Sequence, residues 1–227
     1  MRWPVLIAGS LLLLLSCAHS PELRPDPSVP RAPGNDKAAL VDAAGVRISV
    51  APDAWKGDPS NLTEVFTPLY VTIENASGKP LRISFADFAL SGASGFRYAA
   101  IPPLAAKGTV VSQVAPVPYR FYADRFFIAQ HYSPYYPAFS PWGYPWPYDP
   151  LYYDQYYGYW PEPLPTRDML AEALPEGAVQ DHGRVAGFLY FQSVVTKESQ
   201  VTFEANLVDA SNGQSFGKIT IPFVVKR

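Results

Sequence analysis

The alternation of apolar and polar residues in short segments is the feature that most limits what this chain can fold into. Alternation with a period of two is typical of β-strands that bury one face, and turn sequences such as 75–80 and 209–213 separate the segments. About seven short strands at this spacing predict an all-β fold, an antiparallel β-sandwich. The clearest segments are 46–50, 69–74, 81–85, 185–191, 201–207 and 219–225, with shorter candidates at 96–101 and 110–114.

Local patterns refine this expectation. The turn sequence at 75–80 predicts a hairpin between the segments on either side of it, and 88–90 continues the later segment past a kink. Pro222 cannot donate a backbone hydrogen bond, so its segment is predicted to be an edge strand or to contain a bulge. One short helix is predicted over 167–174, capped by Thr166 and ended by the proline that follows.

The N-terminus reads as an export signal. The apolar run over 5–15 is too short to span a bilayer, which takes about 20 residues, and it leads directly to Cys17. The sequence Leu-Leu-Ser-Cys at 14–17 resembles the lipobox of bacterial lipoprotein signal peptides. That resemblance implies that residues 1–16 are a signal peptide and that Cys17 carries two or three acyl chains. The alternative is a secreted protein with a buried free thiol.

The resemblance also implies a location in the cell envelope, with the lipid as the contact to the membrane. Ala18 stands where an aspartate would often retain a lipoprotein in the inner membrane, so the outer membrane is expected. Residues 17–37 hold five prolines between 18 and 37 and few large apolar side chains. This composition predicts an extended tether between the lipidated N-terminus and a folded domain over 38–227.

Composition excludes several classes of function. The formal net charge is −2 and no run of Lys or Arg occurs, so no nucleic-acid partner is expected. Cys17 is the only cysteine, and its acylation would leave none for a disulfide, a zinc site or a thiol nucleophile. We expect no cofactor and no metal site.

An aromatic tract interrupts the alternating pattern. Tyr, Phe and Trp make up 19 of the 42 residues over 119–160, with frequent prolines that prevent helix and interior strand. The region 116–165 is therefore predicted to be a long Tyr/Pro-rich insertion. Three interpretations of this insertion remain open. It is a low-complexity loop, or a surface that binds a protein or glycan partner, or a segment that contacts the lipid interface. The candidate contact residues are Tyr135, Tyr136, Trp142, Tyr144, Trp146, Tyr148, Tyr152, Tyr153, Tyr156, Tyr157 and Trp160.

The strand segments on either side of the tract resemble those of a known family in sequence. The sequence over 66–98 resembles the telokin-like, immunoglobulin-like domains of bacterial lipoproteins of unknown function, and GRVAGFLYF at 183–191 resembles the hairpin of that family. The similarity covers 45–115 and 177–227, and it implies an immunoglobulin-like sandwich. The positions that carry it are Asn75, Gly78, Phe85, Phe88 and Gly95. The family has no agreed activity and no catalytic residues to transfer.

No constellation of catalytic side chains is recognisable in the sequence. The pair Asp181-His182 stands in a turn sequence and is interpreted as solvated, and His19 and His131 lie near the anchor and in the tract. We therefore expect a non-enzymatic accessory or interaction module of the envelope. The alternative function is glycan binding, with the aromatic insertion as a stacking platform for cell-wall or other polysaccharide.

Overall fold

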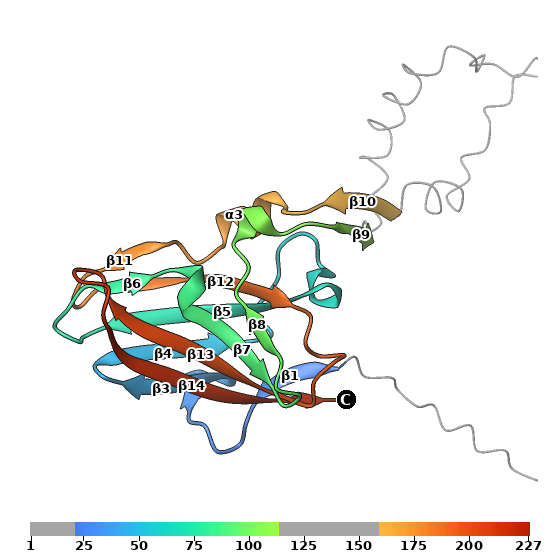
Figure 1. Ribbon diagram of the computed structural model, residues 1–227. Coiled ribbons are helices and arrows are strands. Elements are labelled where there is room, and N and C mark those ends of the chain that lie inside the picture. The colour runs from blue at the N-terminus through green and yellow to red at the C-terminus, as the bar shows by residue number, and fades with distance from the viewer. Residues whose placement is uncertain (1–20, 114–158) are drawn as a thin grey trace, which may run out of the picture.

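The computed structural model describes residues 21–113 and 159–227. Within these two ranges the chain forms two antiparallel β-sheets that face each other (Figure 1), which confirms the predicted all-β sandwich. The immunoglobulin-like character of this sandwich stays a prediction.

The first sheet has the strand order β12-β5-β4-β3-β2. Nine residue pairs join β12 to β5, from Arg184↔Glu74 to Gln192↔Phe66, so this pairing forms the long spine of the sheet. Its strands are β2 (Arg31–Ala32), β3 (Asn35–Ala43), β4 (Val46–Ala51), β5 (Phe66–Asn75) and β12 (Arg184–Gln192).

The second sheet is built around β13, which pairs with β14 on one side and with both β6 and β7 on the other. β1 forms one edge beside β14, while β8 and β11 extend the opposite side beside β7 and β6. Its strands are β1 (Glu22–Pro25), β6 (Leu81–Ile83), β7 (Phe88–Gly92), β8 (Arg97–Ala99), β11 (Gly177–Val179), β13 (Gln200–Asp209) and β14 (Ser215–Lys226).

The remaining elements are short. β9 (Thr109–Gln113) and β10 (Tyr159–Pro163) form a separate two-stranded ribbon, and α3 (Arg167–Ala171) follows it. The described ranges also contain three single turns of 3-10 helix: η1 (Leu62–Glu64), η2 (Phe85–Asp87) and η3 (Pro103–Ala105). η2 lies between β6 and β7, so the predicted kink in that segment is present.

The main core fills the space between the sheets with the alternating apolar residues found in the sequence. Each strand contributes the side chains of one face, and burial of that face is the main favourable term in folding. The members with no more than 1% exposure include Ile48, Val50, Leu69, Val71, Ile73, Leu90, Leu189, Phe191, Val201, Phe203, Ile219, Ile221 and Phe223.

The hairpin predicted around 75–80 is wrong. β5 pairs with β4 and β12 in the first sheet, while β6 pairs with β11 and β13 in the second. The turn therefore carries the chain from one sheet to the other. Alternation shows that a strand buries one face, but both sheets of a sandwich offer that face the same core, so the pattern cannot name the hydrogen-bonded partner.

The tether predicted over 17–37 is wrong from residue 22 onward. β1 pairs with β14 from Glu22↔Lys226 to Pro25↔Phe223, and Leu23 is buried in the main core. β2 then pairs with β3, so the folded domain begins at residue 22 rather than 38. Prolines did not prevent strand formation because β1 is an edge strand, which bonds to a neighbour on one side only.

Pro222 lies where the pairing between β14 and β1 ends. Its carbonyl accepts a hydrogen bond of 3.0 Å from the N–H of Asp26. An ordinary residue at this position would donate in return to the carbonyl of Asp26, and Pro222 cannot. The side chain of Arg31 donates to that carbonyl instead, at 3.1 Å, so the missing donor is replaced.

A buried carboxylate ties the turn between β7 and β8 to the chain before β13. Glu198 is 3% exposed and accepts hydrogen bonds from the N–H and hydroxyl of Ser94 and from the hydroxyl of Tyr98. The bonds from Ser94 are the main cause that lowers the pKa of Glu198. A Cβ at Gly92 would lie 2.3 Å from the carboxyl carbon, so this packing needs a glycine there.

Asn75 joins the two turns at one end of the sandwich. Its side-chain N–H₂ group donates to the carbonyls of Lys79, Val179 and Gln180 at 2.7, 2.9 and 3.2 Å. Its side-chain oxygen accepts from the N–H and the hydroxyl of Ser77. One amide thus satisfies backbone groups on segments about a hundred residues apart in sequence.

We predict that Asn75→Ala lowers the free energy of unfolding by about 2 kcal/mol, because it removes the donor of three partly buried hydrogen bonds to backbone carbonyls. Urea denaturation followed by circular dichroism measures this change. Asn35→Ala is the matched control, since Asn35 is exposed and accepts only a local bond from the N–H of Lys37. Equal midpoints for the two variants would contradict the role assigned to Asn75.

Candidate binding site at the base of the aromatic insertion

The aromatic insertion leaves the domain through the ribbon of β9 and β10, called the stem below. Five residue pairs align it, from Thr109↔Pro163 to Gln113↔Tyr159, and the N–H of Leu164 donates to the carbonyl of Gly108 at 3.0 Å. Gln113 and Tyr159, the described residues on either side of the segment 114–158, are therefore held opposite each other. The insertion predicted over 116–165 thus includes residues, from 159 onward, that belong to the folded part of the chain.

A second apolar cluster lies beneath the stem, separate from the main core. It gathers residues from the loop after β4, from η1, from the chain just before β9, from α3 and from β12. Ala106, three residues before β9, and Leu164, directly after β10, pack in this cluster, so it holds the chain at the foot of both strands of the stem against the sandwich. Its buried members are Trp55, Leu62, Phe66, Ala106, Met169, Phe188 and Tyr190.

Hydrogen bonds hold the loop after β4 against the first turn of α3. The hydroxyl of Thr166 donates to the carbonyl of Asp58 at 2.6 Å, and the N–H of Asp58 donates to the carboxylate of Asp168 at 2.9 Å. The indole N–H of Trp55 donates to the carbonyl of Pro59 at 2.9 Å. The bonds of Thr166 and Trp55 satisfy polar groups that the second cluster buries, whereas the bond from Asp58 to Asp168 is exposed.

The predicted helix after the tract is present, and its cap is the one expected. The hydroxyl of Thr166 accepts a hydrogen bond from the N–H of Met169 at 3.3 Å, as an N-cap residue does. The helix ends at Ala171 rather than at Leu174. Leu174 instead donates its N–H to the carbonyl of Phe188 at 2.9 Å, so pairing with β12 replaces the last helical turn.

β12 is buried on both faces, and a glycine makes this possible. Leu189 and Phe191 face the main core, while Phe188 and Tyr190 belong to the second cluster. Alongside β12, the chain around Leu174 comes so close that a Cβ at Gly187 would lie 2.6 Å from the Leu174 Cα. Ordinary side chains cannot fit at that distance, so the glycine sets the position of the segment that follows α3.

The indole of Trp55 meets two other aromatic rings of the second cluster edge to face. Trp55 lies 5.1 Å from Phe188 and 6.1 Å from Tyr190 between ring centroids, both at 77°. The hydroxyl of Tyr190 donates to the carbonyl of Met169 at 3.0 Å. Burial raises the pKa of Tyr190 well above its usual value, so the phenol stays protonated and acts as a structural donor.

Most of the candidate contact residues lie outside the described residues. This holds for Cys17 and for the tyrosines and tryptophans from Tyr135 to Tyr157. Trp160 is in β10, with its backbone opposite Ser112. Of the eleven candidate contact residues, Trp160 is the one that the described ranges include.

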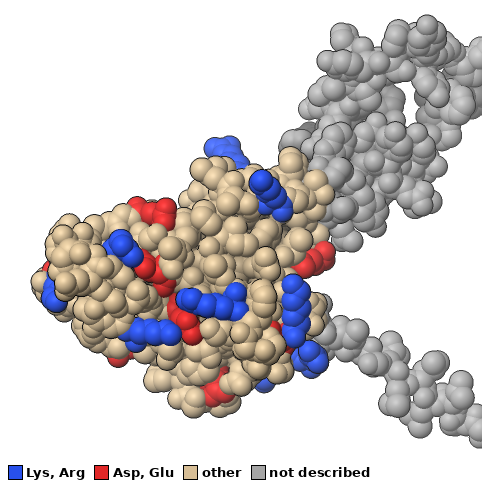
Figure 2. Space-filling view, in the orientation of Figure 1, with Lys and Arg blue, Asp and Glu red and all other residues tan. Residues whose placement is uncertain are grey.

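The pair Asp181-His182 lies in the turn after β11. The imidazole of His182 is 84% exposed and its Nε2 lies 3.3 Å from the carboxylate of Asp181. Asp181 also accepts a hydrogen bond from the N–H of Gly78 at 3.0 Å, so its carboxylate joins this turn to the one after β5. Figure 2 shows basic and acidic side chains interspersed over one face of the sandwich.

Over 21–113 and 159–227, no group of three His, Cys, Asp or Glu side chains is placed to hold a metal ion. Within the same ranges, no helix has the length and apolarity to span a membrane. Comparisons with family models, with curated proteins and with solved structures found no match to this chain.

We predict that Thr166→Val lowers the free energy of unfolding by about 1–2 kcal/mol, because it removes the cap of α3 and the donor to Asp58. Hydrogen exchange of the stem amides should accelerate in the same variant, since the stem depends on the cluster below it. Thr196→Val, at an exposed threonine, is the matched control. Unchanged exchange in the stem of Thr166→Val would show that the cap does not fasten it.

Proposed function

We propose that this protein is a lipid-anchored lipoprotein of the bacterial cell envelope, and that its folded domain presents the aromatic segment 114–158 to a partner. The activity is non-enzymatic, and the lipid on Cys17 is its contact with the membrane, in the outer membrane by preference. The single observation that carries the proposal is the stem, whose register places Gln113 and Tyr159, the residues that flank the segment, opposite each other at one place on the domain.

The chemistry of the segment supports a role in binding. Tyr and Trp offer large rigid surfaces with a polar edge, and they are enriched at the energetic centres of interfaces. The support also has a cost, because the second cluster takes Trp55, Met169 and Tyr190 away from the main core. A domain that needed only to fold could have closed this connection with a short turn.

Glycan binding is the second candidate, and the composition of the segment favours it. Tryptophan side chains stack on the apolar faces of sugar rings, and Trp142 and Trp146 lie in the segment. An immunoglobulin-like sandwich would serve both candidates equally well, since in each the sandwich is the support.

The anchor is tested by Cys17→Ser. We predict that the variant moves from the membrane fraction to the soluble fraction and takes up no labelled palmitate, because it lacks the thiol that is acylated. Ser20→Ala, which keeps the thiol, should remain with the membranes and take up label. A wild-type product that sediments with membranes without any label would overturn the proposed lipoprotein.

The binding role is tested by replacing 114–158 with the dipeptide Asn-Gly. Since Gln113 and Tyr159 are opposite each other, a two-residue turn closes the stem as a hairpin. We predict that the melting temperature stays within about 4 °C of that of the wild type. Crosslinking to envelope partners and binding to purified peptidoglycan or polysaccharide should be lost.

A second variant separates the rings from the length of the segment. It carries 45 Gly and Ser residues in place of 114–158, the same number as the original. This variant should fail to bind just as the hairpin does. Retained crosslinking and glycan binding in both variants would sink the binding role, while quenching of tryptophan fluorescence by cell-wall fragments in the wild type alone would select the glycan candidate.

A further inference from the structure

Exposed apolar side chains gather around one pocket of the domain. Five large apolar side chains are exposed within the described residues: Val65, Tyr70, Phe96, Leu104 and Leu170. Three of them, Tyr70, Leu104 and Leu170, line the same pocket, and Leu104 is 81% exposed. Single exposed apolar residues are ordinary, but a cluster of them around a cavity is typical of a binding site.

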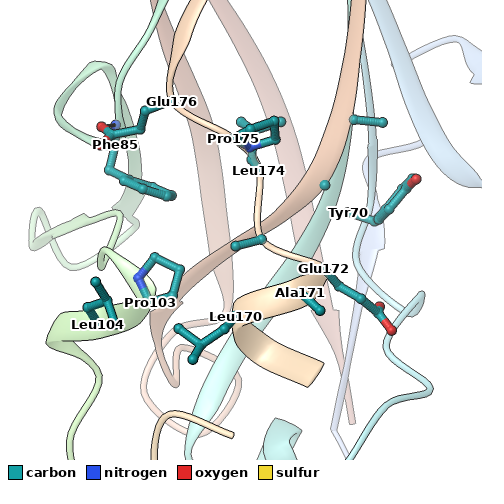
Figure 3. Close-up of a pocket in the computed structure, with 13 residues that line it drawn as sticks. Tyr70, Phe85, Pro103, Leu104, Leu170, Ala171, Glu172, Leu174, Pro175 and Glu176 are labelled. Atoms are coloured by element: carbon teal, nitrogen blue, oxygen red, sulfur yellow. Dashed lines mark hydrogen bonds between the residues drawn. The ribbon is translucent and has the colours of Figure 1, made fainter. Parts of the chain in front are cut away.

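The pocket lies beside α3, where the chain crosses from one sheet to the other. It has a volume of about 750 Å³, within the usual range for ligand sites. Figure 3 shows Pro103 and Leu104 of η3 on one side, Leu170 of α3 below, and Leu174 with Pro175 at the centre. The described residues that line it come from β5, η2, η3, α3, the segment after α3 and β12.

The walls of the pocket are fixed by contacts already described. The segment after α3 is bonded to β12 through Phe188, whose N–H donates to the carbonyl of Glu172 at 2.8 Å. The ring of Tyr70 meets that of Phe188 edge to face, with centroids 5.0 Å apart. Glu176 accepts a hydrogen bond of 2.9 Å from the N–H of Phe85 on the opposite wall. A pre-formed site of this kind spends little free energy on ordering when a ligand binds.

The charge of the pocket has one sign. Its lining contains the carboxylates of Glu172 and Glu176 and no Lys or Arg. Within the described residues, neither carboxylate has a basic side chain within 4.0 Å. The two glutamates lie on opposite sides of the pocket in Figure 3, with apolar residues between them. The complement of this arrangement is an apolar group with positive charge on either side.

We propose that this pocket binds a partner peptide that inserts an apolar side chain between two flanking Lys or Arg residues. The apolar side chain contacts Leu104, Leu170 and the centre of the pocket, and the basic residues meet Glu172 and Glu176. A peptide fits better than a small molecule because the pocket is wide open around Leu104, so the rest of an extended chain remains outside it. Apolar contact supplies the affinity, while the exposed carboxylates supply orientation and speed of association.

The test uses the purified full-length chain and a phage-displayed library of random 12-residue peptides. We expect enriched peptides to share an apolar residue flanked by Lys or Arg. The best of them, synthesised with a fluorescein label, should lose about tenfold in affinity or more for Leu104→Ser combined with Leu170→Ser, measured by fluorescence anisotropy. Both leucines are exposed, so the melting temperature should stay unchanged.

Two single variants refine the test. Phe96→Ser is the matched control, because Phe96 is equally apolar and exposed but lies outside the pocket, and its affinity should equal that of the wild type. Glu172→Gln should weaken binding by about threefold and flatten the dependence of affinity on salt, since it removes one exposed charge. Glu172 is preferred to Glu176, whose carboxylate also bonds to Ser84 and Phe85.

Three outcomes would overturn the proposal. The first is a library that enriches no apolar-basic motif, or peptides that bind the double leucine variant as tightly as the wild type. The second is binding that appears only after 114–158 is replaced by Asn-Gly, which would assign the pocket to that segment. The third is a dimer in analytical ultracentrifugation that the leucine variants abolish, which would assign it to a second copy of the chain.

Discussion

The close approach of Leu174 to Gly187 is the constraint on which the arrangement of α3, the segment after it and the pocket depends. Because position 187 has no side chain, the segment after α3 can lie against β12 and bond to Phe188. That segment ends the helix, covers the edge of the first sheet and forms one wall of the pocket. The same segment also leads into β11, the outer strand of the second sheet. The lack of a side chain at Gly187 therefore lets this segment connect the two sheets. A larger side chain there would separate β12 from the elements that support the stem.

The two proposed binding surfaces, the segment 114–158 and the peptide pocket, depend on the same supporting elements. The main core holds the sheets together, and the second cluster holds α3 and the chain at the foot of the stem against the outer face of β12. Because Glu172, Leu174 and Ile101 bond to Phe188 and Tyr190, the outer edge of β12 is partly paired although the strand lies at the edge of its sheet. The proposed presentation of 114–158 and the proposed peptide pocket both use elements that this second cluster positions, and neither needs the main core to change shape.

Sequence analysis could find the strands that expose one face and bury the other, and it could not find the rest. β4, β5, β13 and β14 were visible because their apolar residues alternate. β12 was visible from the apolar residues of one face, although the structure buries both of its faces. β3 was missed because Ala38, Ala39, Leu40 and Val41 follow one another without alternation, and β1 was hidden among prolines. The second cluster draws on Trp55 and Leu62 in a loop with no period, so only the folded chain brings them to Met169. Asn75 and Thr166 were visible as turn and cap residues, whereas the partners of their side chains were not.

Because β1 begins at Glu22, little chain is left between the proposed lipid anchor and the folded domain. If Cys17 carries the proposed lipid, five Cα-to-Cα steps separate the anchored residue from Glu22, and a fully extended chain of that length spans about 17 Å. This linker cannot gain residues from β1 unless the pairing between β1 and β14 breaks. The domain would then lie close to the lipid headgroups. A binding partner would have to reach it there, because the linker is too short for the domain to extend across the periplasm.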